Sequence, residues 1–332
     1  MKKFKVISSI CMIVLIVSLT IFSIVYFSHK NKEGKVVVTI FPIYDICREI
    51  LGTDEDIVML QDNGADMHSY QATASDIATI SKAELFIMVG GESDSWVGNV
   101  IRSANNVNLS TVSLMDIVAK VEESDDNISQ GHDHHHEEGE DHHHEEGEEH
   151  HEEDIHYDEH VWLSIKNMIT ATNYISSELI SVFPERTEII KENTEIYLAE
   201  LYAIESEYRD ALEGKDAFYL VADRFPFIYL MNDYGLPYHA AFSGCSSETD
   251  ASAETMSELI NRVREKNLKS IYITETSDGS IAEQVKATVG RNDIEILTIN
   301  SCQSVSADNL ESLSYVSIMR DNLEKLKRGI IG

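Results

Sequence analysis

The chain has 332 residues, enough for about two domains, and 43% of them are apolar, so it is not disordered as a whole. It carries 26 Lys and Arg against 58 Asp and Glu, a formal net charge of −32. This charge argues against binding to nucleic acid or to an anionic membrane surface, because both require a positive footprint. A cationic partner is favoured instead, and the 14 His residues are the first indication of which cation.

The N-terminal segment has Lys2, Lys3 and Lys5 followed by an uncharged, mostly apolar run over 6–28. The run exceeds the about 7–15 residues of a cleaved signal and lacks a small-residue cleavage site at its end. It is long enough to span a bilayer, which takes about 20 residues. We therefore expect residues 1–33 to anchor the chain in the membrane uncleaved, with the rest outside the cell. A cleaved signal is the alternative.

Residues 34–183 are expected to form an N-terminal α/β lobe, because β-branched and apolar runs alternate there with one-sided apolar helices. Gly52 ends the first helix, and Thr73 with Asp76 forms a capping box that opens the second. The expected strands are 35–40, 56–60 and 85–89, and the expected helices are 43–51 and 73–83.

A long helix over 184–213 is expected to link this lobe to a second one. It follows a shorter helix at about 166–182, begins at Pro184, and repeats apolar residues every three to four positions, which marks one buried stripe.

Residues 214–332 repeat the alternation of strands and helices. The expected strands are 217–221, 270–274 and 294–299, and the expected helices are 227–234, 251–266, 280–289 and 308–327. Such alternation is typical of βαβ units in a parallel sheet, whose ligands bind at the carboxyl ends of the strands. We predict an α/β fold of two lobes, each a mainly parallel sheet flanked by helices, with a ligand cleft between them.

An acidic segment inside the first lobe carries the clearest chemical signal. Residues 122–159 contain eighteen Asp and Glu and neither Lys nor Arg. A merely solvated linker would not need the His residues that accompany them, and neutral imidazole is a preferred ligand of zinc. We expect 122–156 to be a disordered loop that binds divalent metal at low specificity. Its His residues are His132, His134, His135, His136, His142, His143, His144, His150, His151 and His156.

A specific metal site must lie on the ordered lobes. Beyond His29 and the loop, the chain has His68, His160 and His239. His68 follows the strand at 56–60, and His160 stands where order resumes, so both lie where a cleft would be. A single His is more often an ordinary core or surface residue, but the His-rich loop leads directly into His160 and favours ligation.

Two stretches around these His residues resemble the motifs of a known family. Residues 64–70 read G-A-D-M-H-S-Y, and residues 74–77 read A-S-D-I. Together they are similar to the G-A-D-P-H-x-Y-x-P-x-x-x-D signature of zinc/manganese ABC-transporter substrate-binding proteins. Residues 158–162, D-E-H-V-W, resemble that family's D-P-H-V-W. The similarity covers nearly the whole chain outside the membrane segment and is closest to the His-rich-loop zinc branch. It implies a monomeric extracytoplasmic protein that binds one metal between its lobes and hands it to a membrane permease with its ATPase.

The resemblance also implies the metal ligands, with one departure. His68 and His160 match the two His ligands of the first lobe. The third ligand is usually a His, or a Glu in manganese members, but this chain has Asp223 and Arg224 there. Arg stays protonated and cannot ligate a metal. Asp223 is therefore the expected ligand, with Arg224 turned away or paired with another acid.

The fourth family ligand is an acid after a later strand, and Glu275 and Asp278 are the candidates. The alternative, for either residue, is an ordinary helix-cap or loop acid that binds no metal. His239 is an alternative replacement for the missing His, against the plainer interpretation of a His within a strand.

The family also bears on the cysteines. Some zinc members have a disulfide within the second lobe, and Cys245 and Cys302 occupy similar positions, so we expect a bond between them. Two free thiols, or Cys245 as a soft zinc ligand, are the alternatives. Cys47 falls on a buried helix face and is expected in the core.

The favoured function is therefore capture of Zn²⁺ by a binding protein, not an enzyme. A manganese protein of the same family is the first alternative, because carboxylates favour harder metals. A surface zinc buffer or adhesin without a permease is the second. A zinc hydrolase is the third, although the chain has no H-E-x-x-H, nucleophile elbow or Gly-rich phosphate loop.

Overall fold

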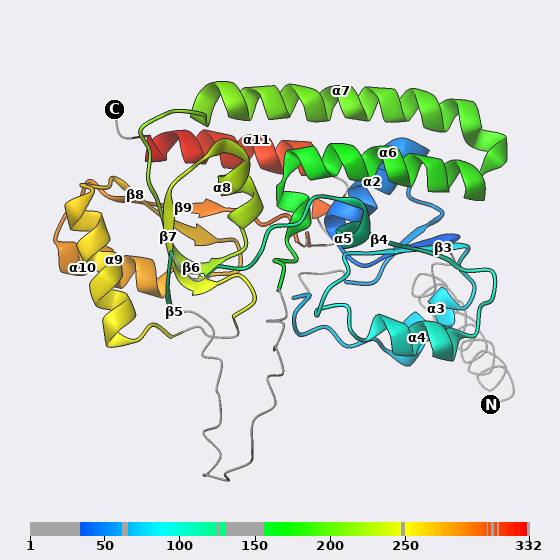
Figure 1. Cartoon of the computed structure of the whole chain (residues 1–332), viewed down its shortest axis with the longest axis horizontal. Helices are drawn as coiled ribbons and strands as arrows, with labels where there is room; N and C mark the ends of the chain where they lie inside the picture. The colour runs from blue at the N-terminus through cyan, green and yellow to red at the C-terminus, as the bar shows by residue number, and fades with distance from the viewer. Residues whose placement is uncertain are drawn as a thin grey trace, which may run out of the picture.

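The computed structural model describes residues 34–61, 66–124, 127–130, 156–246, 250–303, 305–306, 309–310 and 312–330. Two parallel sheets occupy the two halves of the molecule, and a long helix runs across both (Figure 1). The predicted α/β fold with two sheets and a long helix is confirmed. None of the described helices has the length and apolar character of a membrane span, and the predicted span at 6–28 lies outside the described residues.

The first sheet has four parallel strands in the order β2-β1-β3-β4. Its central strand, β1 (Val36–Val38), is three fully buried valines, as expected for a strand covered on both faces. β2 (Ile57–Met59) and β3 (Leu85–Met88) flank it where the sequence predicts strands. β4 (Ser110–Ser113) is an edge strand with two exposed residues, and its polar sequence gave no signal for prediction.

Helices cover both faces of this sheet. α2 (Phe41–Leu51) ends at Gly52, whose φ of 68° is left-handed and whose N–H donates to the Arg48 carbonyl. α3 (Ala74–Ile80) begins with the predicted capping box, in which Thr73 and Asp76 bond reciprocally. α4 (Val97–Ala104) and α5 (Leu114–Ile117) were not predicted from the sequence.

The second sheet has five parallel strands in the order β5-β7-β6-β8-β9. The strands are β5 (Ile128–Gln130), β6 (Tyr219–Phe225), β7 (Tyr238–Ser243), β8 (Ser270–Thr274) and β9 (Glu295–Ile299). The helices of this lobe are α8 (Ile228–Tyr234), α9 (Ala253–Glu265), α10 (Ser280–Val289) and α11 (Tyr315–Leu326), with a last turn at Lys327–Gly329.

Two predicted boundaries in this lobe are wrong. β6 extends to Phe225, so Asp223 and Arg224 lie in a strand instead of at the start of a helix. The pairing of β6 with β7 shifts register between Val221 and Arg224, which gives the end of the strand an irregular path. The last helix begins at Tyr315, because Ser314 supplies a capping box there.

The acidic segment also differs from the prediction. Part of it is β5, which pairs in parallel with β7 and forms an edge of the second sheet. Glu122 and Tyr157 form an antiparallel bridge, so the two ends of the acidic segment lie side by side. Nine of the ten loop His residues, 132–151, lie outside the described residues. Removing 122–156 would therefore remove an element of the fold together with the His residues.

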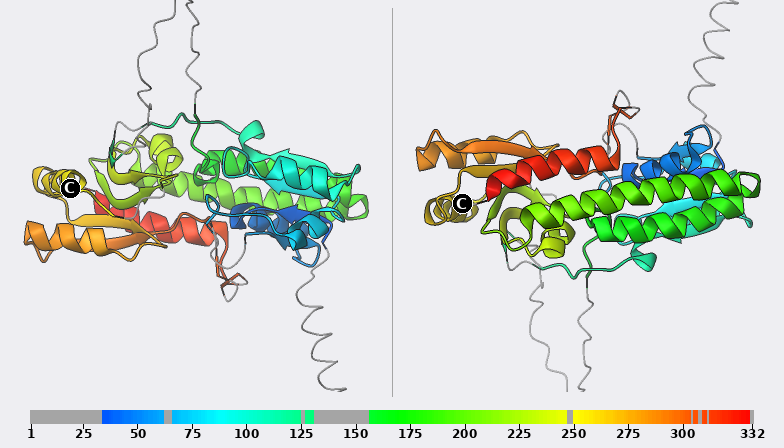
Figure 2. Two further views of the ribbon diagram at one scale, coloured as in Figure 1. Left: turned by 90° about the horizontal axis from the view of Figure 1, so that it is seen from below. Right: turned by 90° about the horizontal axis from the view of Figure 1, so that it is seen from above.

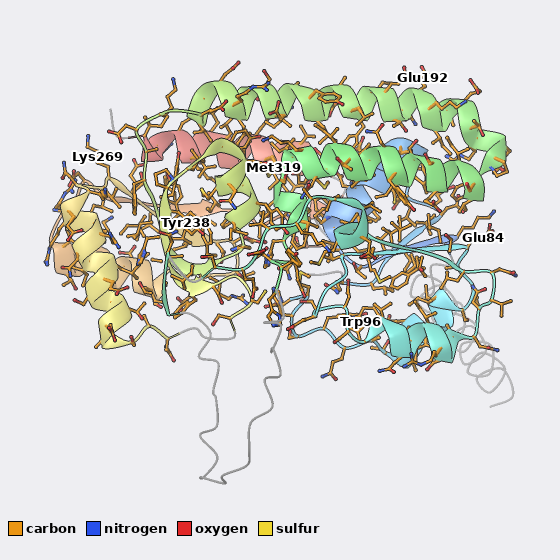
Figure 3. The ribbon with its side chains drawn as sticks, viewed as in Figure 1. Glu84, Trp96, Glu192, Tyr238, Lys269 and Met319 are labelled. Atoms are coloured by element: carbon orange, nitrogen blue, oxygen red, sulfur yellow. The ribbon has the colours of Figure 1, made fainter. Side chains whose placement is uncertain are left out.

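A layer of helices joins the two lobes. After a short turn at Val161–Leu163, α6 (Ile165–Val182) and a turn at Pro184–Arg186 lead into α7 (Thr187–Leu212), which at 1.5 Å per residue is about 39 Å long. α7 runs past both α2 and α11 when the molecule is seen from above (Figure 2). Glu192 lies on the outer side of this layer and Met319 on the inner side (Figure 3).

The largest apolar core runs through both lobes along α7. The buried residues of α7 are Ile190, Thr194, Tyr197, Leu201, Ile204, Tyr208 and Leu212, which is the predicted stripe. The Tyr208 hydroxyl donates to the Met319 carbonyl of α11 at 2.7 Å. The same core continues into β1, α2 and α6 on one side and α8 on the other. A shared core of this kind resists large rotation of one lobe against the other.

Candidate metal site

A cleft opens where the strands of the two sheets end. From the first lobe it is lined by Asp66, His68 and His160, and from the second by Arg224, Pro226, Gly244, Thr274, Glu275, Thr276, Ser301 and Gln303. Most of these residues follow the carboxyl ends of β2, β6, β7, β8 and β9, which is where ligands of open parallel sheets bind. Gly244 permits the close approach of the lobes, because a Cβ there would lie 3.0 Å from His160 Cε1.

His68 and His160, the His pair, meet in this cleft. Their Nε2 atoms are 3.3 Å apart, although the residues are far apart in the sequence. Two donors about 2.0–2.1 Å from a tetrahedral zinc ion are about 3.3–3.4 Å apart. The His pair therefore has the spacing of two ligands of one zinc ion.

The other ring nitrogen of each His is held by a neighbour. His160 Nδ1 lies 3.0 Å from Asp158 Oδ1, and His68 Nδ1 lies 2.8 Å from Ser93 Oγ. A carboxylate accepts a hydrogen bond, so neutral His160 carries its proton on Nδ1 and presents a lone pair on Nε2. Glu159 fixes the turn that holds Ser93 by accepting its backbone N–H at 3.0 Å. Carboxylate support of this kind orients a metal-binding His and strengthens it as a donor.

The electrostatics of the two rings differ. Burial and the neighbouring His160 lower the pKa of His68 to about 4, which keeps this ring neutral near pH 7. Burial also opposes protonation of His160, but the adjacent carboxylate of Asp158 outweighs it and raises the pKa. A metal ion bound here would displace that proton.

The wall from the second lobe contributes one carboxylate. Glu275 follows β8 and accepts hydrogen bonds from the Ser301 backbone N–H at 2.9 Å and from its hydroxyl at 2.6 Å. Ser301 is tied to the first lobe, because the buried Trp162 indole donates to its carbonyl at 2.7 Å. Glu275 thus lines the same cleft as the His pair on a braced support, and it stays a predicted ligand.

The other predicted ligands lie elsewhere. Asp223 accepts bonds from the Arg224 N–H at 2.8 Å and from the Thr274 N–H at 3.1 Å, and it is not part of the cleft lining. Asp278 is exposed, accepts from the Ser280 N–H at the start of α10 and is not part of the cleft lining, which favours the alternative of an ordinary cap or loop acid. His239 contacts Ser129 Oγ at 2.8 Å, away from the cleft.

Arg224 lines the cleft, and of the two expected arrangements it adopts the second: it is paired with another acid and is not turned away. Its Nη1 donates to Asp66 Oδ2 at 2.9 Å and so bridges the two lobes. Among the described residues, no group of three or more His, Cys, Asp and Glu side chains is gathered tightly enough to hold a metal. Of the predicted ligands, the His pair is thus the part that already lies together.

The predicted disulfide is wrong for this structure, in which Cys47, Cys245 and Cys302 are free thiols. The surroundings of the second-lobe thiols differ: Cys245 lies beside the Glu123 carboxylate, whereas Cys302 is fully buried with its sulfur 3.9 Å from the Asn300 carbonyl. Burial raises the pKa of the Cys245 thiol, and Cys245 is not part of the cleft lining.

Sequence reasoning missed the residues that orient the His pair. Asp158 stood in the recognised motif but was not assigned a role, and its spacing of two residues from His160 was the available signal. Ser93 follows β3 closely, and the rule that site residues follow strand ends would have identified it. His156, the described end of the loop, lies half-exposed with Nδ1 3.4 Å from Glu92 Oε1.

Two parallel-sheet lobes with a His pair at their junction define a metal-binding protein of the cleft type. The family described as zinc-uptake complex component A, periplasmic (ZnuA), matches residues 36–329, and the chain belongs to this family. It is a family of transport components and not of enzymes.

Individual relatives agree with this assignment. The chain is 29% identical over 301 residues to the zinc-binding protein AdcA of Streptococcus pyogenes serotype M3, covering 89% of this chain and 56% of the relative. It thus spans about half the length of the AdcA relatives. It is 26% identical over 302 residues to the high-affinity zinc uptake system protein ZnuA of Bacillus subtilis, covering 91% of this chain and 89% of the relative.

Solved structures show the same fold. The Zn(II)-bound ZnuA-like domain of Streptococcus pneumoniae AdcA matches with a TM-score of 0.69 at 21% identity, covering 90% of this chain and 99% of that domain. YcdH of Bacillus subtilis, a metal-dependent lipoprotein, matches with a TM-score of 0.69 at 22% identity and covers the same share of this chain.

Proposed function

We propose that this chain is an extracytoplasmic binding protein that captures Zn²⁺ in its cleft and delivers it to an ABC importer. The observation that carries the proposal is the 3.3 Å spacing of the two Nε2 atoms in the His pair, which suits a tetrahedral zinc ion. Family membership and the zinc-binding relatives support it. Zinc is the cargo of this protein, so the site must both bind and release it.

The proposal includes the partners and the location of the protein. A permease and its ATPase receive the metal, and residues 1–33 hold the binding protein at the membrane as a monomer. The supporting observation is the long apolar run at 6–28, together with relatives named as a lipoprotein and as a zinc uptake component.

Zinc is favoured over manganese by the residues that line the cleft. The manganese alternative relied on an oxygen-rich site, but Asp223 and Asp278 are not part of the lining. Asp66 does line the cleft but is paired with Arg224, which leaves the His pair and Glu275 as candidate ligands. Two imidazoles and one carboxylate suit zinc better than a harder ion.

The test is competitive titration of the full chain with Zn²⁺ and Mn²⁺. The ten loop His residues are changed to Asn so that the cleft is measured alone and β5 is retained. Binding of one zinc ion in preference to manganese, lost in His68→Ala with His160→Ala, is the expected result. Preference for manganese, or no stoichiometric binding, contradicts the proposal.

The His-rich segment is proposed to collect zinc for the cleft. Its two ends meet at the bridge between Glu122 and Tyr157, next to Asp158 and His160. Metal gathered by the segment would therefore be concentrated at the cleft. The expected result is slower zinc uptake at low zinc when the loop His residues are Asn, with unchanged affinity of the cleft. Equal uptake at low zinc would disprove the collecting role.

A further inference from the structure

The two members of the His pair are held in place differently. His160 is buried and leads directly into the helical turn at Val161–Leu163 and then into α6. His68 is only partly buried and stands in a turn at 67–69 between β2 and α3, outside any helix or strand. The position of His68 therefore depends on hydrogen bonds to its turn and to neighbouring segments.

Asp66 links this turn to the second lobe. One of its carboxylate oxygens, Oδ1, accepts the backbone N–H of His68 at 3.0 Å. The other oxygen, Oδ2, accepts a hydrogen bond from Arg224 Nη1 at 2.9 Å across the cleft. A single carboxylate thus ties the backbone of a predicted zinc ligand to an arginine of the opposite wall.

Arg224 is held in turn by Asp223, the acid that the sequence suggested as the third ligand. Asp223 Oδ1 accepts the Arg224 backbone N–H at 2.8 Å. Asp223 Oδ2 accepts the backbone N–H of Thr274, at the end of β8, at 3.1 Å and also accepts from its hydroxyl. The backbone from which Arg224 projects is therefore fixed to the neighbouring strand. A continuous set of bonds connects β8 to the backbone of His68.

We infer that Arg224 is a positioning residue for zinc, which holds His68 in place through Asp66. This inference rests on the proposed zinc function. Arg cannot ligate a metal, and at this position it joins the two walls directly by an ion pair, where a third protein ligand would join them through the metal. Holding a ligand in place before binding lowers the cost of ordering it when the metal arrives.

Two other roles for Arg224 make different predictions. The ion pair could be a contact of the fold alone, but its side chains are 26% and 35% exposed, and partly exposed pairs add little stability. The positive charge could also simply repel zinc from the cleft. Removal of the Arg224 side chain would weaken zinc binding if it positions His68. Removal would tighten binding if the charge repels zinc, and it would change nothing if the contact serves only the fold.

The experiment uses the full chain with the ten loop His residues changed to Asn, and zinc affinity is measured by competition. Arg224→Met is expected to weaken zinc binding by about tenfold, as for loss of a group that supports a metal ligand. Arg224→Lys keeps the charge and a donor and is expected to restore most of the affinity. Arg291→Met is the matched control and should change nothing. Arg291 is also 26% exposed and paired with an acid, Asp293, but neither residue lines the cleft.

A second comparison tests the route through Asp66. Asp66→Asn keeps an acceptor for the His68 N–H but loses the ion pair, so it should weaken zinc binding in the same way. The two changes together should weaken binding no more than the larger single loss, because both break one contact. Fully additive losses would overturn the inference, since Arg224 would then act independently of Asp66.

The outcomes separate this inference from the proposed function. Zinc binding that is equal or tighter in Arg224→Met, with one ion still bound, overturns the inference and leaves the proposed function intact. Absence of stoichiometric zinc binding by the chain with an unchanged cleft overturns both.

Discussion

The two walls of the cleft are prepared for a metal to different degrees. On the first-lobe wall, Ser93 and Asp158 hold the His pair with both Nε2 atoms at zinc-ligand spacing. On the second-lobe wall, Glu275 is bonded to Ser301, and Arg224 reaches across to an acid of the opposite wall. Under the proposed function, the first wall would capture zinc and the second would adjust to complete the site. Preorganised ligands cost less to order on binding, so most of the affinity should reside in the first wall.

The largest expected effect is loss of a member of the His pair. His160→Ala should weaken cleft binding of zinc by more than about 100-fold, because it removes a ligand instead of a supporting group. Competitive titration in the background without loop His measures it. His239→Ala is the matched control, since His239 is also a buried His but contacts Ser129. Equal effects of the two changes would show that the His pair is not the site.

Loss of a group that orients the pair should have the next largest effect. Asp158→Asn is expected to weaken zinc binding by about 10–100-fold, because the carboxylate fixes His160 and strengthens it as a donor. Ser93→Ala is expected to fall at the low end of that range. Ser129→Ala, which removes a similar hydroxyl contact from His239, should leave the affinity unchanged. The same titration applies, and a silent Asp158→Asn would contradict the account of the first wall.

The second wall should be less sensitive. Glu275→Gln is expected to weaken zinc binding by about tenfold, because the carboxylate must leave Ser301 before it contributes. Asp278→Asn is the control and should change nothing, since that acid is exposed at the start of α10. A larger loss with Glu275→Gln than with His160→Ala would reverse the comparison between the walls.

A smaller effect concerns stability and pH. Burial and the nearby charge of Glu159 raise the pKa of Asp94, in the turn below Ser93, from 3.8 to about 6. The folded state therefore holds this proton more tightly than the unfolded state, so the associated stability is complete below about pH 4 and is lost as the pH rises through 6. Asp94→Asn has no carboxyl group to lose a proton and should keep this stability at pH 7. Its free energy of unfolding at pH 7 should therefore exceed that of the original chain by about 1–3 kcal/mol.

Urea unfolding at pH 4 and pH 7 measures this change. The two proteins should have nearly equal stability at pH 4 and separate at pH 7. A difference of the same size at both pH values would show that Asp94 is not the titrating group.

The sequence predicted most helices and strands because hydrophobic periodicity and capping residues are local signals that determine where such elements form. The valines of β1, the stripe of α7 and the capping box at Thr73 are local signals, and each element formed where they lie. β4 and β5 were missed because they are short edge strands in polar sequence, whose pairing depends on distant partners.

The positions of site residues could be predicted only for those residues that lie within a recognised sequence motif. His68 and His160 were assigned correctly as neighbours in the cleft. The direction of Asp223 depended on the path of β6, which continues past the expected end of the strand and turns that carboxylate toward Thr274. The contact between Arg224 and Asp66 joins two lobes, and no pattern in one stretch of sequence reports such a pairing.

The most direct test of the central claim is a crystal structure of the zinc-loaded full chain with anomalous data at the zinc edge. The account predicts one strong peak in the cleft, about 2.0–2.1 Å from the Nε2 atoms of both His68 and His160. Zinc bound only outside the cleft, with the His pair free of metal, would contradict it.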